Sequence, residues 1–310
     1  MSTLSFMVSQ LDRLDPKLHQ PLYSTSWSRD VTVRGDINFG HMSTSFVRHT
    51  MGAVGSQSPT GKPWLSPKAT ALPGVTLDGE RIVLPIRPLG MELSYTSIEL
   101  ERSQLLSTSI DQAQFDALNI FYQMTTDEMV YIGDAPLAVT GLLNDATVGA
   151  ALVAADGTGA STLWTSKTTD QIIRDVNAIL TAAWTNSGFT SVPNRLLISP
   201  AEYAYISNTP RATVSDTTIK RFIEMNNLST EQNGGELMIE PVKWLTGRGA
   251  GGTNRMVAYT MDADKVRFPM IPIRRETPYN LGIHYNSPYI WAYGQMEVIY
   301  PECMLYRDGI

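Results

Sequence analysis

Two glycine-rich segments carry the residue types and spacings that come closest to a chemical motif. The segment Gly247–Gly252 matches the dinucleotide-binding pattern G-x-G-x-x-G letter for letter. Such a loop holds a pyrophosphate only where a strand precedes it and a helix follows it, because the N-terminus of that helix binds the phosphates. Here a strand-like segment, 255–260, follows instead. We therefore expect a mobile loop at residues 246–254 and no cofactor.

The segment Gly55–Lys62 resembles a phosphate-binding loop less closely. Five residues separate Gly55 from Gly61, where the motif has about four. Pro63 occupies the position of the Ser or Thr that would bind a metal ion. The tip of a loop is the simpler interpretation of this segment.

Acidic and sulfur-containing residues form no recognisable catalytic pattern. Asp127 and Glu128 are adjacent on an expected helix, so they point in different directions and are expected to be solvated or at an interface. Asp262 and Asp264 could contact a cation, although acidic turns of this kind are common. The single cysteine, Cys303, is expected to be a small buried residue. The sequence therefore predicts no catalytic residue, no metal ligand and no enzymatic activity.

The overall composition argues against a sequence-specific DNA reader. The 310 residues carry a net charge of −6, whereas such readers need Lys and Arg to neutralise phosphates. Only 17% of the residues are charged, which fits a surface largely covered by neighbouring subunits. The first residues do not resemble a signal peptide, and the longest apolar run, 150–155, is too short to span a bilayer. We expect a protein of a cytosol-like compartment that enters no membrane.

Periodicity divides the first third of the chain into an arm and a β-rich segment. Residues 1–30 are polar and irregular, which is typical of an arm. Residues 31–90 alternate apolar and polar side chains in places, as at 82–86, which indicates strands. Eight Gly and Pro residues from Gly52 to Gly74 interrupt these strands. A loop of this length is unusual inside a compact domain, so we expect it to function outside its own domain.

Helical spacing dominates residues 97–132. Gly and Pro are absent from Ser109 to Ile132, and Gly133 follows as a helix stop. Thr96 with Glu99 forms the pattern of a capping box at the start of the helical region. The expected apolar side of the long helix is formed by Ala113, Ala117, Ile120 and Met124, and it is widened by Phe115, Leu118, Phe121 and Tyr122.

The remaining chain mixes helices with short strands. A capping box from Thr168 to Gln171 begins a helix whose apolar residues continue to Ala183. Further helices are expected at 200–207 and 217–227, and further strands at 196–198, 236–242, 255–260 and 283–300, the last with a bulge at Gly294. The order of elements predicts an α+β protein without internal repeats.

In this order the segments resemble the major capsid proteins of tailed bacteriophages, whose fold is of the Hong Kong ninety-seven type. The resemblance is carried by Gly133-Asp134 with Gly141-Leu142-Leu143-Asn144, by Trp164 with Thr168–Val176, and by Pro301 with Tyr306–Ile310. It extends over nearly the whole chain.

The resemblance implies a division of the chain and a function. The implied parts are an N-terminal arm (1–30), an extended β-hairpin loop (31–90), a peripheral domain with a long spine helix (91–165), an axial domain (166–282) and a return strand to the peripheral domain (283–310). The implied function is self-assembly into hexamers and pentamers of an icosahedral head shell around the double-stranded DNA genome. Assembly in the host bacterial cytoplasm, a place in the virion, and portal and scaffolding or decoration proteins as partners are implied as well.

Charge placement suggests where two copies meet. From residue 37 to 77 no acid accompanies Arg48, Lys62 and Lys68, whereas residues 92–134 hold eight acids and one base. In the resembled fold the extended loop lies across the peripheral domain of a neighbour, so we expect these opposite charges to orient it. Trp64 and Leu65 are the expected apolar anchors. The full set of interface candidates is Arg48, Lys62, Trp64, Leu65, Lys68, Asp116, Asp127 and Glu128.

Three alternatives remain open at this stage. The charge of the loop could be accidental. The chain could form an encapsulin-like compartment that encloses a protein cargo and no genome. It could also be an α/β enzyme that binds a nucleotide at the loop Gly247–Gly252.

Overall fold

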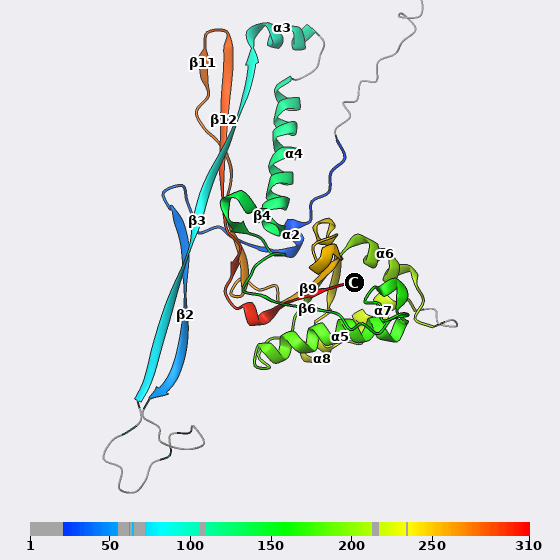
Figure 1. Ribbon diagram of the computed structural model, residues 1–310. Helices are drawn as coiled ribbons and strands as arrows, with labels where there is room; N and C mark the ends of the chain where they lie inside the picture. The colour runs from blue at the N-terminus through cyan, green and yellow to red at the C-terminus, as the bar shows by residue number, and fades with distance from the viewer. Residues whose placement is uncertain are drawn as a thin grey trace, which may run out of the picture.

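A computed structural model describes most of the chain. The described residues are 21–54, 74–105, 110–212, 217–233 and 235–310, together with Lys62, Trp64 and Leu72. Figure 1 shows an elongated molecule in which a long sheet and a long helix run side by side, while a second sheet with its helices lies at the lower right.

The long sheet has seven strands and is mainly antiparallel. Its main path is β1 (Thr32–Arg34), β10 (Val266–Arg275), β12 (His284–Gly294), β3 (Gly74–Thr96) and β2 (Ser43–Val54). β11 (Tyr279–Leu281) pairs with β12, and β13 (Glu297–Val298) pairs with β10. β3 is long enough to pair with β2 over its first half and with β12 over its second half. Residues 43–54 and 74–85 therefore form a two-stranded ribbon that projects from the fold (Figure 1).

The long helix runs beside the second half of β3 (Figure 1). α3 (Ser97–Leu105) and α4 (Ile110–Tyr131) follow β3 in the chain. The capping box at the start of α3 is confirmed, because the Thr96 hydroxyl accepts from the Glu99 amide at 3.2 Å and the Glu99 carboxylate accepts from the Thr96 amide at 2.9 Å. The expected apolar side of α4 is confirmed only in part. Leu118 and Tyr122, expected to widen it, are buried together with Val130, whereas Ala117 and Met124 of its expected centre are exposed.

The end of α4 explains two of the glycines in the sequence. Gly133 has a φ of 76°, and a Cβ atom there would overlap the backbone of Val139. A Cβ atom at Gly141 would overlap the backbone of Tyr131. The Asn144 side chain donates to the carbonyl of Ile132 and accepts from the amide of Gly141, both at 2.7 Å. The stretch from Gly133 to Asn144 therefore closes the C-terminal end of the helix.

The second sheet has five strands covered by helices. Its order is β6 (Gly149–Leu152), β14 (Met304–Asp308), β9 (Arg255–Tyr259), β7 (Arg195–Ile198) and β8 (Met238–Pro241). The helices of this part are α5 (Thr169–Asn186), α6 (Pro200–Asn208), α7 (Ile219–Met225) and α8 (Leu228–Asn233). The capping box at the start of α5 is confirmed. The helix expected at 217–227 is confirmed as the shorter α7. A separate helix, α8, was not expected, and the Asn227 side chain before it accepts from the amide of Thr230.

The two faces of the five-stranded sheet pack into different cores. Met256 and Ala258 of β9 lie in a cluster with Val176 and Ile179 of α5. The alternate residues Val257 and Tyr259 pack into the larger cluster that includes α4 and the long sheet. Because successive side chains of a strand point to opposite faces, this single sheet joins both halves of the molecule.

The short elements complete the fold. They are α2 (Trp27–Asp30), β4 (Gly133–Asp134) paired with β5 (Val139–Thr140), and the 3-10 helices η1 (Ala135–Leu137), η2 (Trp164–Ser166), η3 (Lys243–Leu245), η4 (Ala250–Gly252) and η5 (Pro301–Cys303). Within the part of the chain that the structure describes, no helix is both long and apolar enough to cross a membrane.

The expected division of the chain is wrong at its C-terminal end. β10 falls in the segment expected to be the axial domain, yet it is an inner strand of the long sheet. Residues 283–310 were expected to return as one strand, but β12 and β13 lie in the long sheet and β14 lies between β6 and β9 in the other. Local periodicity shows that these segments are strands, and it carries no information on which distant strand each one pairs with.

Candidate assembly interface

One face of the projecting ribbon is largely apolar, and no described part of its own chain covers it. Cross-strand register places Val47, Met51, Val75, Leu77 and Val83 on this face, each between 50% and 78% exposed. Arg81 and His49 interrupt the face. We call this set of five side chains the ribbon face. Exposed apolar side chains gathered on one face in this way are typical of a contact with another molecule.

The opposite face of the ribbon differs in kind. Near the base, Phe46 and Ile82 are half-buried and Thr44 is buried, which agrees with the alternation read from 82–86. Further out, Arg48 lies directly across from Glu80. The negative charge of Glu80 therefore balances the expected positive charge of Arg48 within the ribbon. A charge count over residues 37–77 does not show this, because Glu80 lies just outside that range.

The loop between β2 and β3 holds the other candidates. Trp64 is 73% exposed, and its amide donates to the carbonyl of Lys62 at 2.8 Å. The Trp64 ring would bury a large apolar area if another molecule covered it, so its exposure is typical of a contact surface. Leu65 and Lys68 lie outside the described residues.

The surface of α4 carries both acidic and apolar side chains. Phe121 and Met124, 47% and 49% exposed, lie on the same side of the helix as the exposed Glu128. Phe115, 41% exposed, points toward the sheet instead. Asp116 accepts a hydrogen bond from Gln112 at 2.9 Å. The side with Phe121 and Met124 therefore offers apolar contact area next to the negative charge of Glu128.

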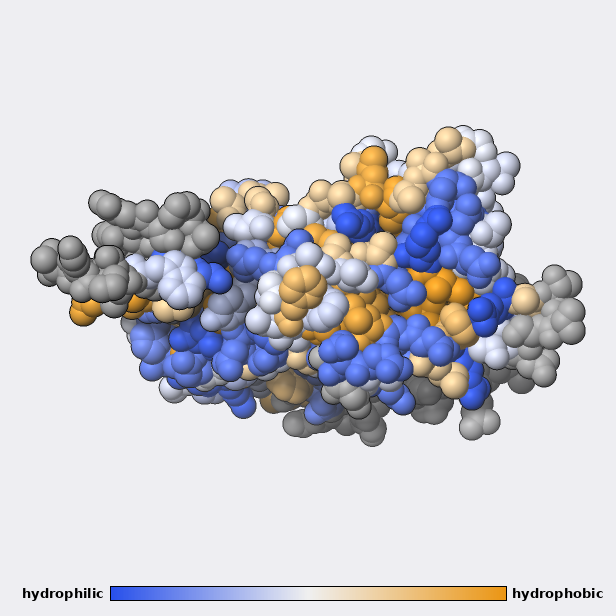
Figure 2. All heavy atoms as spheres, turned by 90° about the horizontal axis from the view of Figure 1, so that it is seen from below, coloured by the Kyte–Doolittle hydropathy of each residue, from blue (hydrophilic) through white to orange (hydrophobic). Residues whose placement is uncertain are grey.

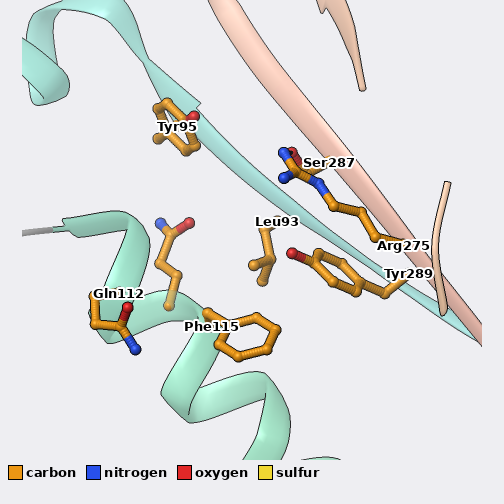
Figure 3. A pocket seen from close by; sticks show the side chains of 8 residues that line it. Leu93, Tyr95, Gln112, Phe115, Arg275, Ser287 and Tyr289 are labelled. Carbon is orange, nitrogen blue, oxygen red and sulfur yellow. Dashed lines mark hydrogen bonds between the residues drawn. The ribbon is translucent and has the colours of Figure 1, made fainter. Parts of the chain in front are cut away.

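Two hollows flank Leu93, where β3 passes under α4. The first has a volume of about 230 Å³, and in Figure 3 Phe115 from α4, Leu93 from β3 and Tyr289 from β12 point toward one another around it. The Phe115 and Tyr289 rings lie 5.9 Å apart. The second hollow has a volume of about 390 Å³ and is lined by Met91, Leu93 and Phe121, among others. Each hollow is of a size to receive one or two side chains of another molecule.

Asp127 is not an interface residue, and this prediction is wrong. Its carboxylate is fully buried, and it accepts hydrogen bonds from the amides of Ser26 and Trp27 and from the indole of Trp244. A buried carboxylate is retained where donors satisfy it. The sequence shows Asp127 beside the exposed Glu128, but it does not show the N-terminal segment folding back onto the helix.

The glycine-rich segment 246–254 has no features of a nucleotide site. The strand β9 follows it, as expected. Its amides are used within the fold: Gly249 donates to the carbonyl of Thr253 at 2.7 Å, and Ala250 donates to the carboxylate of Asp308 at 3.0 Å. These bonds do not fit the expected mobile loop. Among the described residues, no group of three or more His, Cys, Asp and Glu side chains could hold a metal ion.

Comparison with known proteins agrees with this geometry. The family model for major capsid proteins matches residues 61–310. No curated protein matches the sequence. Among solved structures, the capsid of Myoviridae phage XM1 is similar at a TM-score of 0.78 and 16% identity, over 97% of this chain and 98% of that chain.

Two further structures share the fold at low sequence identity. The capsid of a native GTA particle has a TM-score of 0.64 and 11% identity, over 99% of this chain and 98% of that one. A Mycobacterium phage Ogopogo chain has a TM-score of 0.60 and 12% identity, over 99% of both chains. With a family match over most of its length and the Hong Kong ninety-seven type of fold, this chain belongs to the major capsid protein family and is a subunit of a capsid shell.

Proposed function

We propose that this subunit forms hexamers and pentamers in the icosahedral head of a tailed phage, around double-stranded DNA. The observation that carries this proposal is the ribbon face, because it extends five exposed apolar side chains away from the molecule's own cores. The cost of exposing them is recovered when a neighbouring copy covers them.

The neighbour's contact surface is the side of α4 and β3 that holds the two hollows. The loop after β2 brings Trp64, and by sequence Leu65, to this surface as anchors. The exposed Phe115, Phe121 and Met124 supply the complementary apolar area. Buried aromatic anchors of this kind carry most of the binding energy in protein interfaces.

Charges guide this contact and add little to its strength. Lys62 and Lys68 of the loop face Asp116 and Glu128 of the neighbour in this arrangement, whereas Arg48 is offset by Glu80. Exposed pairs contribute only about 0–1 kcal/mol each. Their main effect is on the rate and register of association.

The contents and partners of the shell follow from its charge and closure. Because each subunit has a net charge of −6, the shell encloses DNA without binding particular sequences. A head that takes up DNA needs an entry point, so a portal protein is a proposed partner, together with scaffolding or decoration proteins. Assembly takes place in the host bacterial cytoplasm.

The test is to produce the full chain in bacteria and examine the particles by electron microscopy and nuclease treatment. The proposal predicts closed icosahedral particles with pentamers at the vertices and hexamers between them. Particles from infected cells should protect double-stranded DNA. Particles that hold only a folded protein cargo would favour the encapsulin-like compartment instead, and a soluble monomer at high concentration would contradict both.

A further inference from the structure

The last residues of the N-terminal arm form a bridge between α4 and the five-stranded sheet. Residues 24–31 include the single turn α2, which lies against α4 (Figure 1). Their polar groups bond to both sides of this junction. We call residues 24–31 the clasp.

On the helix side, the clasp is held mainly by the buried Asp127. One carboxylate oxygen accepts from the amide of Ser26 at 2.8 Å and from the amide of Trp27 at 3.2 Å. One turn earlier, Gln123 accepts from the indole of Trp27 at 3.0 Å. These bonds satisfy the first amides of α2, which would otherwise lack partners.

On the sheet side, the same carboxylate reaches η3, directly after β8. Its second oxygen accepts from the indole of Trp244 at 2.7 Å and lies 3.2 Å from the ammonium of Lys243. That ammonium also donates to the carbonyl of Ser24 at 2.8 Å. Asp127 therefore joins three elements: α4, the clasp and η3.

The clasp makes further bonds of its own to β8 and β9. Arg29 donates to the carboxylate of Glu240 at 2.8 Å, and it also bonds the buried Asp30. The hydroxyl of Tyr259 donates to the carbonyl of Asp30, while the hydroxyl of Tyr131 on α4 donates to its carboxylate. Burial and the neighbouring Asp30 raise the pKa of Tyr131, so that hydroxyl stays protonated and remains a donor.

We propose that the clasp is a releasable lock that fixes the angle between α4 and the five-stranded sheet. Two observations favour a lock over a simple anchor. Its bonds are polar and directional, so they define an angle more sharply than apolar packing does. It also follows residues 21–23 directly in the chain, so force or binding on the preceding part of the N-terminal arm acts on it first.

The role of the clasp in shell curvature rests on the proposed function. Pentamers and hexamers place one subunit at two curvatures, which requires two angles between its halves. A small shift at a packed, hydrogen-bonded junction switches between discrete arrangements and does not bend continuously. Binding of the arm to a second copy of this chain would then select one arrangement by its differential affinity for the two.

The test compares Asp127→Asn with Glu128→Gln in the full chain. Both changes remove one negative charge from adjacent positions of α4, but Asp127 is buried against the clasp, whereas Glu128 is exposed. Asp127→Asn places an amide donor opposite the Trp244 indole and the Lys243 ammonium, so it disrupts the junction. Trp244→Phe is a milder second variant, because it removes one donor and keeps an aromatic ring.

Two measurements on unassembled subunits judge the lock itself. Hydrogen exchange of residues 24–31 should be about tenfold faster or more in Asp127→Asn, and faster in Trp244→Phe, but unchanged in Glu128→Gln. Small-angle X-ray scattering should show a broader distribution of maximum dimensions in the two clasp variants. Faster exchange with an unchanged scattering curve would overturn the proposal, because the segment would then hold only itself. Unchanged exchange would overturn it as well.

A third measurement separates this proposal from the proposed function. Shells of the clasp variants should vary in diameter, whereas those of Glu231→Gln, which removes an exposed acid of α8 outside the proposed contact, should match the unmodified shells. Clasp variants with faster exchange, altered scattering and shells of one normal size would contradict the link to curvature. If the unmodified chain forms no shells, the proposed function fails, while the first two measurements still decide whether the clasp sets the angle.

Discussion

Thr50 and Met51 are adjacent on β2 and face opposite sides of the ribbon. Met51 belongs to the ribbon face and is 77% exposed. Thr50 is exposed on the other face, across from Asp78. The pair provides a direct comparison of the two faces, because a substitution at either position leaves the fold of the subunit intact.

We expect Met51→Lys to block shell assembly and Thr50→Lys to leave it close to normal. A lysine on the ribbon face would carry an unpaired charge into an apolar contact. The stability of the unassembled subunit should change by no more than about 0.5 kcal/mol in either variant, because both sites are exposed. Light scattering during assembly measures the first effect and urea unfolding the second. Equal assembly of the two variants would show that the ribbon face is not buried in the shell.

Cys303 provides a test of packing at a single atom. The side chain is buried in η5, and burial raises the pKa of its thiol. Because the thiolate is the reactive form, less of it is present at a given pH. At pH 8 the native subunit should react with a thiol reagent about tenfold more slowly, or slower still, than the chain unfolded in denaturant. A native rate equal to the unfolded rate would mean that the packing around η5 is wrong.

At the scale of elements, the start of α5 is the clearest case of local control. The Thr168 side chain accepts from the backbone of Gln171, and the Gln171 side chain accepts from the amide of Thr168 at 2.7 Å. Thr168→Ala should lower the free energy of unfolding by about 1 kcal/mol. The control is Thr181→Ala, an exposed position within the same helix, which should be neutral or slightly stabilising. Chemical unfolding of both variants measures the difference, and equal losses would argue against the cap.

Elements of this local kind were predictable from sequence, and their partners were not. Each capping box, at Thr96 and at Thr168, depends on only four consecutive residues, and α4 ends because of the single residue Gly133. The buried side of α4 is predicted only in part, because the helix is apolar on more than one side. Leu118, which faces the sheet, and Phe121, which lies half-exposed, have the same character in sequence.

Long-range pairing accounts for most of the other errors. The ribbon face needs the register of two strands, although the alternation of Val75, Leu77 and Val83 with polar residues is visible in the sequence. A charge count over 37–77 omits Glu80, which the register places opposite Arg48. The burial of Asp127 is not visible in the sequence, because its donors lie about a hundred residues away on either side.

The loop between β2 and β3 carries the electrostatic prediction. Replacing Lys62 and Lys68 with Gln should slow assembly at low salt and make its rate less dependent on salt, because these charges steer the encounter. The final yield of shells should change little. Arg221→Gln, an exposed basic residue on α7, serves as the control. Unchanged rates and salt dependence in the double variant would show that the charge of the loop has no role in assembly. The proposed role of Trp64 as an apolar anchor would not be affected.

At the scale of the whole molecule, the projecting ribbon and the hollowed side of α4 are different surfaces of one subunit. A contact between two different surfaces repeats head to tail, and it closes into a ring when the rotation between copies allows. Figure 2, a view from below, shows further apolar areas among polar ones on the described surface. These areas fit a molecule that has neighbours on several sides.

The most direct measurement of the central claim is a cryo-electron microscopy reconstruction of particles assembled from the full chain. It should show a closed shell in which the ribbon face of one subunit, with Met51 and Leu77, is covered by another copy. The loop with Trp64 should lie against the neighbour's α4 and β3, near Leu93. A closed shell in which the ribbon face remains open to solvent would contradict the proposed contact, and the absence of any closed particle would contradict the account as a whole.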